Sequence, residues 1–171
     1  LGLLAEVSIK VLPMAPAEAT LCFEMDQTQA LTALHRWGGQ PLPLNASCWV
    51  QDQGRSVLYV RLRGAVAAVE AACQHMGGER QHNTTVADDW VACGEQRLPF
   101  FTQAPAGASL WRVSLPQTAP ALSLGGQPPE AQLVEWHGAQ RWVWAPAEQA
   151  VAIRAAAQAA GGHATLFRPA A

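Results

Sequence analysis

The chain has 171 residues, of which half are hydrophobic and only 14% are charged, with a formal net charge of −2. This composition excludes a disordered tail, and the dispersed cationic residues exclude a basic surface for nucleic acid. The four cysteines lie 20 or more residues apart without a CxxC pair, so we expect reduced thiols, no metal site and a cytoplasmic location.

The first predicted element is a half-buried strand over residues 5–11, in which apolar and polar residues alternate. Pro13 and Pro16 end it. A strand without a neighbouring partner in the sequence belongs to a sheet that lies upstream. We therefore interpret residues 1–13 as a terminal strand of a preceding domain, and residues 14–171 as the domain proper.

In the first half of that domain, the sequence predicts a strand at 17–24. A helix follows, which begins after the N-cap residue Asp26 and ends at Gly38-Gly39. A hairpin follows, with strands at 46–51 and 56–62 around Gly54. The next helix spans 65–76 and ends at Gly77-Gly78. A separate helix over 86–98 is expected to begin at a cap formed by Thr84 or Thr85.

The second half repeats this order, with a strand at 109–115, a hairpin at 133–144, a helix at 147–160 and a strand at 163–167. At an offset of 84 the apolar and polar faces of the two hairpin-and-helix segments agree. The repeats cover about 17–82 and 108–168. The expected fold is α+β, with antiparallel sheet(s), helices on one face and duplicated ferredoxin-like βαββα units.

The same offset matches Trp142 and Trp144 to Leu58 and Val60, which predicts that all four face the helices. Alternation then places Arg61, Arg63 and Arg141 on the opposite, open face. A two-residue turn at Gly138-Ala139 would set Trp136 across from Arg141. We interpret this pair either as a surface cation–π contact or, if the face is covered, as a binding feature.

Few side chains indicate chemistry by themselves. His163 begins a strand directly after Gly161-Gly162, where an imidazole can project from the end of a sheet, although a structural role is the commoner one. No nucleotide-binding GxGxxG and no GxSxG are present, and no histidine–carboxylate set has metal-ligand spacing.

Four stretches of the sequence resemble known protein families. The stretch Leu1–Pro13 resembles the end of the flavin-binding domain in the FAD-linked oxidase, or vanillyl-alcohol oxidase-like, superfamily. The strings Leu110–Pro116, Glu135–Trp142 and Gly161–Arg168 are similar to the smaller, FAD-binding subunits of bacterial glycolate oxidases. Arg112, Arg141, His163 and Arg168 lie within these strings.

The resemblance implies a C-terminal cap domain that follows an FAD-binding domain. It further implies a complex with a second flavin subunit and an iron–sulfur subunit, on the inner face of the membrane. The implied reaction oxidises glycolate, a small 2-hydroxyacid, to glyoxylate with FAD. His163, Arg112 and Arg141 are its candidate catalytic residues, and Trp136, Arg141, Arg61, Arg63 and Arg168 its candidate substrate or partner face.

The FAD-binding half lies outside these 171 residues, so we expect no flavin binding and no activity from this chain alone. Two other functions remain open. The chain would act either as a non-catalytic module for subunit assembly or as a regulatory domain that binds a small ligand between its repeats.

Overall fold

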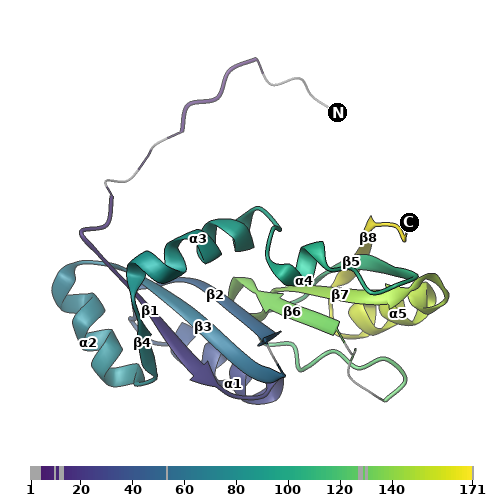
Figure 1. Cartoon of the computed structure of the whole chain (residues 1–171), viewed down its shortest axis with the longest axis horizontal. Coiled ribbons are helices and arrows are strands. Elements are labelled where there is room, and N and C mark those ends of the chain that lie inside the picture. The colour runs from purple at the N-terminus through teal and green to yellow at the C-terminus, as the bar shows by residue number, and fades with distance from the viewer. Residues whose placement is uncertain are drawn as a thin grey trace.

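The computed structural model describes residues 5–9, 11, 14–52, 54–126, 129 and 131–170. Its strands form one antiparallel sheet of eight strands in the order β4-β1-β3-β2-β6-β7-β5-β8 (Figure 1). The first unit contains β1 (Ala17–Glu24), α1 (Gln27–Gly38), β2 (Leu44–Asp52), β3 (Arg55–Gly64), α2 (Val66–Met76) and β4 (Glu79–Gln81). Helices α3 (Asn83–Gly94) and α4 (Pro99–Thr102) connect it to the second unit.

The second unit contains β5 (Ala108–Ser114), β6 (Ala131–Glu135), the 3₁₀ turn η1 (Trp136–Gly138), β7 (Gln140–Pro146), η2 (Ala147–Gln149), α5 (Ala150–Ala159) and β8 (His163–Arg168). Its strands follow the order of the first unit, since β8-β5-β7-β6 corresponds to β4-β1-β3-β2. The two units meet where β2 pairs with β6. The predicted α+β fold and its duplication are therefore confirmed. The second unit has a proline-rich connection after residue 115 where the first has α1.

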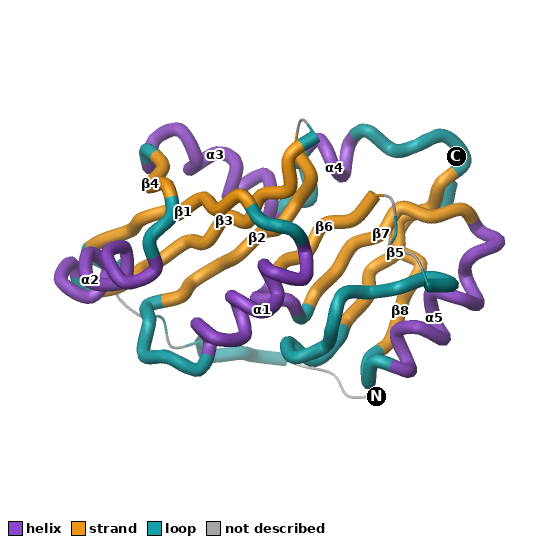
Figure 2. The backbone as a smooth tube through the Cα atoms, turned by 90° about the horizontal axis from the view of Figure 1, so that it is seen from below, coloured by secondary structure: helices purple, strands orange, loops and turns teal. Residues whose placement is uncertain are grey.

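Helices cover the two faces of this sheet unequally. Buried residues of α1 and α2 pack on Leu58 and Val60, and Ile153 of α5 packs on Val143. Trp49, Val134 and Arg141 are directly opposite one another in neighbouring strands, so their side chains lie on the same face of the sheet. Helices α1, α2 and α5 therefore all cover this one face (Figure 2). We call it the α1 face. Helices α3 and α4 pack on the opposite face, here the α3 face, against Cys48, Leu133, Trp142 and Trp144.

Local signals set most of the boundaries. Asp26 caps α1 through a capping box, accepting from the Gln29 backbone N–H while the Gln29 side chain accepts from the Asp26 N–H. Such a cap stabilises a helix by about 1 kcal/mol. The helix predicted over 86–98 is instead α3, which begins at Asn83 with His82 as its N-cap residue and without a side-chain cap bond. Thr84 and Thr85 lie inside the helix, so their predicted capping role is wrong.

The strand predicted over 5–11 is absent from the described residues 5–9 and 11, which have no regular secondary structure. Their apolar side chains Val7, Ile9 and Val11 are exposed. A strand needs a hydrogen-bonding neighbour, and the predicted neighbour belongs to a preceding domain, so this strand stays a prediction.

The faces of the second hairpin were predicted the wrong way round. Val143 packs under α5 as Val60 packs under α2, so the strands of the two units correspond at a spacing of 83 residues. The helices α2 and α5 correspond at a spacing of 84 residues. The second unit thus has one more residue between strand and helix. Because side chains alternate along a strand, this single residue moves Trp142 and Trp144 to the α3 face and Arg141 and Val143 to the α1 face.

Candidate functional site

Polar side chains gather on the α3 face of the second unit, along β5 and β8. Alternation places Arg112 and Ser114 on the same face as the buried Leu110, and His163 and Thr165 on the same face as Phe167, which packs on Trp142. The strand register sets Arg112 opposite Thr165 and Ser114 opposite His163. We call these four residues the β5–β8 patch. Diagonal neighbours on paired strands have Cβ atoms about 7–8 Å apart, so one small ligand can contact both Arg112 and His163.

Arg112 differs from the other arginines in the described part of the chain. Each of the others has a hydrogen bond, an ion pair or an aromatic ring as a partner, and the structure records none for Arg112. The side chain is half-buried between β7 and β8. A guanidinium without a partner among the described residues, held by neighbouring strands, is suited to bind a carboxylate through two parallel hydrogen bonds.

The position of His163 depends on the glycine before it. A Cβ built on Gly162 would lie 2.0 Å from the Ser114 carbonyl oxygen and 2.8 Å from Leu115 Cδ2. Only glycine lets β8 begin this close to the end of β5. Gly162 therefore sets the first residue of β8 and places the exposed His163 side chain beside Ser114.

Glu135, an acidic residue of β6 on the α3 face, is held in place by other side chains. Glu135 is buried and accepts hydrogen bonds from Trp142 Nε1 (2.8 Å), Gln140 Nε2 (2.5 Å) and Cys93 Sγ (3.5 Å). Cys48 lies opposite Glu135 on β2, and a hydrogen bond with Cys93, together with burial, raises the pKa of the Cys48 thiol well above its usual value. With its oxygens already bonded, Glu135 joins β6, β7 and α3 and is not a free base.

Three of the predicted face residues lie on the α3 face but are already paired. Arg61 donates from Nε to Asn45 Oδ1 and lies 5.0 Å from the centre of the Trp90 ring. Arg63 forms a 2.9 Å ion pair with Glu18. Arg168 donates to the Phe101 carbonyl oxygen and so ties β8 to α4. These contacts stabilise the packing of the face.

The predicted pairing of Trp136 with Arg141 is wrong. The β6–β7 loop has four residues, not two, so Arg141 lies opposite Val134, and Trp136 is an exposed loop residue. Arg141 is fully buried on the α1 face, where it donates to the carbonyl oxygens of Gly138, Pro120 and Ala119. Burial lowers its pKa to about 10. Arg141 thus anchors the proline-rich connection and has no access to a ligand on the α3 face.

The turn before β7 holds a half-buried histidine that the sequence did not indicate. Trp136 and His137 both have positive φ, and Gly138 (φ +98°) packs so closely that a Cβ would lie 2.9 Å from Leu31 Cδ2. The His137 backbone N–H donates to Ser47 Oγ, and its buried Nδ1 has no partner among the described residues. Burial lowers the pKa of His137 below its usual value of 6.5.

This lowered pKa predicts an acid-sensitive fold. The unfolded chain binds a proton at His137 at a higher pH than the folded chain does, so stability present above pH 6.5 is lost as the pH falls below it. We expect the melting temperature to drop less between about pH 7.5 and about pH 5 in His137→Asn, since asparagine tolerates a positive φ and does not titrate. Thermal melting at both values checks this. An equal drop in both proteins would contradict it.

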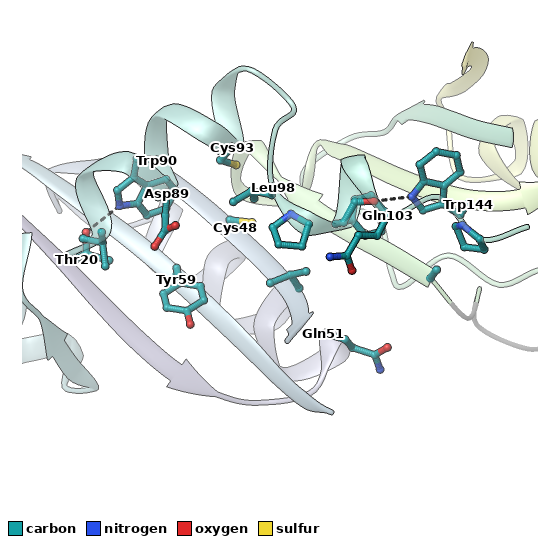
Figure 3. Close-up of a pocket in the computed structure, with 16 residues that line it drawn as sticks. Thr20, Cys48, Gln51, Tyr59, Asp89, Trp90, Cys93, Leu98, Gln103 and Trp144 are labelled. Carbon is teal, nitrogen blue, oxygen red and sulfur yellow. Dashed lines mark hydrogen bonds between the residues drawn. The ribbon is translucent and has the colours of Figure 1, made fainter. Parts of the chain in front are cut away.

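A pocket of about 590 Å³ lies on the same face, under α3 and α4 (Figure 3). Trp90, Phe100 and Trp144 contribute rings, and Cys48, Val50 and Ala131 contribute parts of the sheet from both units. Gln51, Asp89 and Gln103 are exposed polar residues in the lining. Among the residues that the structure describes, no lysine, arginine or histidine lines this pocket. We call it the α3 pocket.

Strand alternation could have indicated Ser114 and Thr165 as partners of Arg112 and His163, because they stand two residues away in the same strings. Glu135, Cys48 and Cys93 could not be grouped from the sequence, since they come from three elements far apart in the chain.

The described residues contain no cluster of three or more His, Cys, Asp or Glu side chains able to hold a metal ion. They also contain no helix with the length and apolar character that crossing a bilayer requires.

The fold and the site define an α+β domain whose two units share one strand order, with an exposed polar patch and a ring-lined pocket on the α3 face. No family model matches the chain, and no solved structure matches it. The chain is similar to the glycolate oxidase subunit GlcE of Escherichia coli strain K12, with 38% identity over 167 residues. The match covers 98% of this chain and 43% of that relative, so the chain spans less than half of the relative's length. The resemblance predicted from the sequence is thereby confirmed.

Proposed function

We propose that residues 14–171 form the cap domain of an FAD-binding subunit in a complex that oxidises glycolate to glyoxylate. The similarity to a glycolate oxidase subunit over nearly the whole chain is the observation that carries this proposal. The remainder of the subunit then supplies the FAD-binding domain. A second flavin subunit and an iron–sulfur subunit complete the complex, which lies at the cytoplasmic side of the membrane.

The side chains here suit only part of such a reaction. A bound flavin supplies the acceptor for the hydride that leaves the 2-hydroxyacid. The sequence has no glycine-rich phosphate loop, and no cation lines the α3 pocket within the described part of the chain, which supports a diphosphate of FAD held by the rest of the subunit. The contribution of the cap is therefore substrate binding on its α3 face.

The β5–β8 patch supplies the groups that a 2-hydroxyacid needs. Arg112 binds the carboxylate, because no described residue pairs with its guanidinium and competes with the ligand. His163, diagonally across from it, is exposed and accepts the hydroxyl proton. Ser114 and Thr165 place hydroxyl groups between the two, where they orient the substrate.

Subunit assembly is the second candidate function. Val91 of α3 and Phe167 of β8 are large apolar side chains that remain 51% and 39% exposed. A partner subunit that packed on them would cover apolar area and contribute binding energy. In that case the domain supports the complex without contacting the substrate.

A chimaeric protein tests the proposed function. In a strain that lacks GlcE, the matching segment of that subunit is replaced by this chain, and glycolate-dependent dye reduction is measured in extracts. We expect activity well above that of a strain that carries the truncated subunit. A chimaera that co-purifies with the other subunits but restores no glycolate oxidation would contradict a catalytic cap and favour the assembly role.

A further inference from the structure

Two cysteines from distant parts of the chain meet beneath α3. Cys48 belongs to β2 and Cys93 to α3, and both side chains are buried. The structure records a hydrogen bond between them, and both thiols are free (Figure 3). A disulfide bond requires two cysteine side chains that face each other at short range. This pair meets that requirement without a rearrangement of β2 or α3.

The hydrogen bonds give the two thiols different roles. Cys48 lies directly opposite Glu135 in the register of β2 and β6, and Cys93 Sγ donates to Glu135 Oε2 at 3.5 Å, so the three side chains form one group. The bond to Cys93 and burial raise the pKa of Cys48 well above its usual value, so Cys48 is protonated at neutral pH. Because a thiolate attacks an oxidant and a thiol does not, the first attack falls to Cys93.

The α3 pocket provides the route by which an oxidant reaches the pair, since both cysteines contribute to its lining. Asp89 adds a carboxylate, and the described residues place no lysine, arginine or histidine in the lining. An anionic, bulky oxidant such as oxidised glutathione meets repulsion there and cannot align its disulfide with a buried sulfur. The contacts therefore favour a small, uncharged oxidant, and hydrogen peroxide has these properties.

We propose that Cys48 and Cys93 form a redox-active pair that hydrogen peroxide converts into a disulfide bond between β2 and α3. Cys93 attacks one peroxide oxygen, the O–O bond breaks, and Cys93 becomes a sulfenic acid while one water leaves. Cys48 then attacks the sulfenic sulfur, the S–S bond forms, and a second water leaves. In sum, the two thiols lose two electrons and two protons, and the peroxide gains them.

The bond fastens α3 to the middle of the sheet. In the reduced chain, α3 is held there by packing and by side-chain hydrogen bonds, such as the one that Trp90 Nε1 donates to Thr20 Oγ1 at 2.9 Å. A covalent link between residues far apart in the sequence restricts the unfolded chain most, so the oxidised chain should melt about 5–10 °C higher. The proposal rests on the thiol contacts and is independent of the proposed function.

Oxidation of the 171-residue chain with hydrogen peroxide, followed by unfolding and alkylation, tests the proposal. Before oxidation all four cysteines should be alkylated, and afterwards only Cys22 and Cys73. Mass spectrometry should find one linked peptide pair that joins Cys48 to Cys93. Dithiothreitol should restore full alkylation and the original melting temperature. Oxidised glutathione at the same concentration should form the bond at least about 10-fold more slowly.

Two variants complete the test. Cys22→Ser/Cys73→Ser is the matched control, because it removes the half-buried thiols outside the pair and should form the bond at the wild-type rate. Cys48→Ala should abolish the bond and the rise in melting temperature, and Cys93→Ala replaces it should it fail to fold. A Cys48–Cys93 bond in the wild type and the control supports the proposal. A bond that involves Cys22 or Cys73, sulfinic acid at Cys93 without a bond, unchanged alkylation, or equal rates with both oxidants overturns it.

Discussion

Replacing Arg141 with alanine is expected to lower the free energy of unfolding by about 3–5 kcal/mol. Its guanidinium is fully buried and donates to three backbone carbonyl oxygens, those of Gly138, Ala119 and Pro120. Without it, these acceptors lose their donors in a site that water does not replace, and each buried, unsatisfied group costs about 1–3 kcal/mol. The side chain also leaves a cavity. Urea unfolding of the 171-residue chain measures the loss.

Two further variants show whether the loss comes from this anchoring role. Arg141→Lys keeps the charge but cannot reach three carbonyls in a plane, so it should recover only part of the stability. Arg97→Ala removes an arginine whose ion pair with Glu95 is exposed, and it should cost less than about 1 kcal/mol. A loss of under 1 kcal/mol for Arg141→Ala would mean that the proline-rich connection is held by other contacts.

Gly162→Ala is the second change for which we expect a large loss, about 3 kcal/mol of unfolding free energy. The new Cβ would lie 2.0 Å from the Ser114 carbonyl oxygen and 3.0 Å from Leu115 Cα, both backbone atoms. No side-chain rotation relieves such a contact, so β5 and β8 have to separate at the end where Ser114 pairs with His163. The same variant should therefore also disturb the candidate site.

Gly94→Ala provides the matched control in thermal melting. A Cβ at Gly94 has no neighbour within 4 Å, and this residue ends α3. Alanine favours a helix over glycine by up to about 1 kcal/mol, so this variant should be as stable as the wild type or slightly more stable. If Gly162→Ala melts at the wild-type temperature, the close approach of β8 to β5 does not exist in solution.

Short-range signals in the sequence were sufficient for most of the fold. Asp26 with Gln29 marked the start of α1, and Gly77-Gly78 marked the end of α2, because capping and left-handed residues act over a few positions. The duplication was also visible, since the helices of both units match at one spacing. Two elements, β4 and α4, escaped prediction because three or four residues carry too little periodicity.

The errors about the second hairpin have one cause in common, which is that strand faces depend on single residues. One extra residue before α5 reversed the faces of β7, and the four-residue loop after Glu135 replaced the expected two-residue turn. Positive φ is unfavourable for a bulky residue such as Trp136. Packing of Gly138 on Leu31 and the bond to Ser47 stabilise this turn, and both depend on tertiary contacts.

Of the predicted site residues, Arg112 and His163 lie together, whereas Arg61, Arg63 and Arg168 are paired with other groups. No local pattern distinguishes an arginine with a partner from one without, because the partners come from distant elements such as α3 and α4. The α3 pocket is invisible in the sequence for the same reason. Its lining joins both units and the helices between them.

The central claim, that the β5–β8 patch binds the substrate of a glycolate-oxidising complex, is tested most directly by Arg112→Met in the chimaeric complex. We expect kcat/KM for glycolate to fall about 100-fold, mainly through KM, which corresponds to about 2.7 kcal/mol. Arg112→Lys should restore part of the affinity, and Arg97→Met, an exposed arginine elsewhere, should leave the kinetics unchanged. Wild-type KM and kcat in an Arg112→Met complex that assembles fully would contradict the claim.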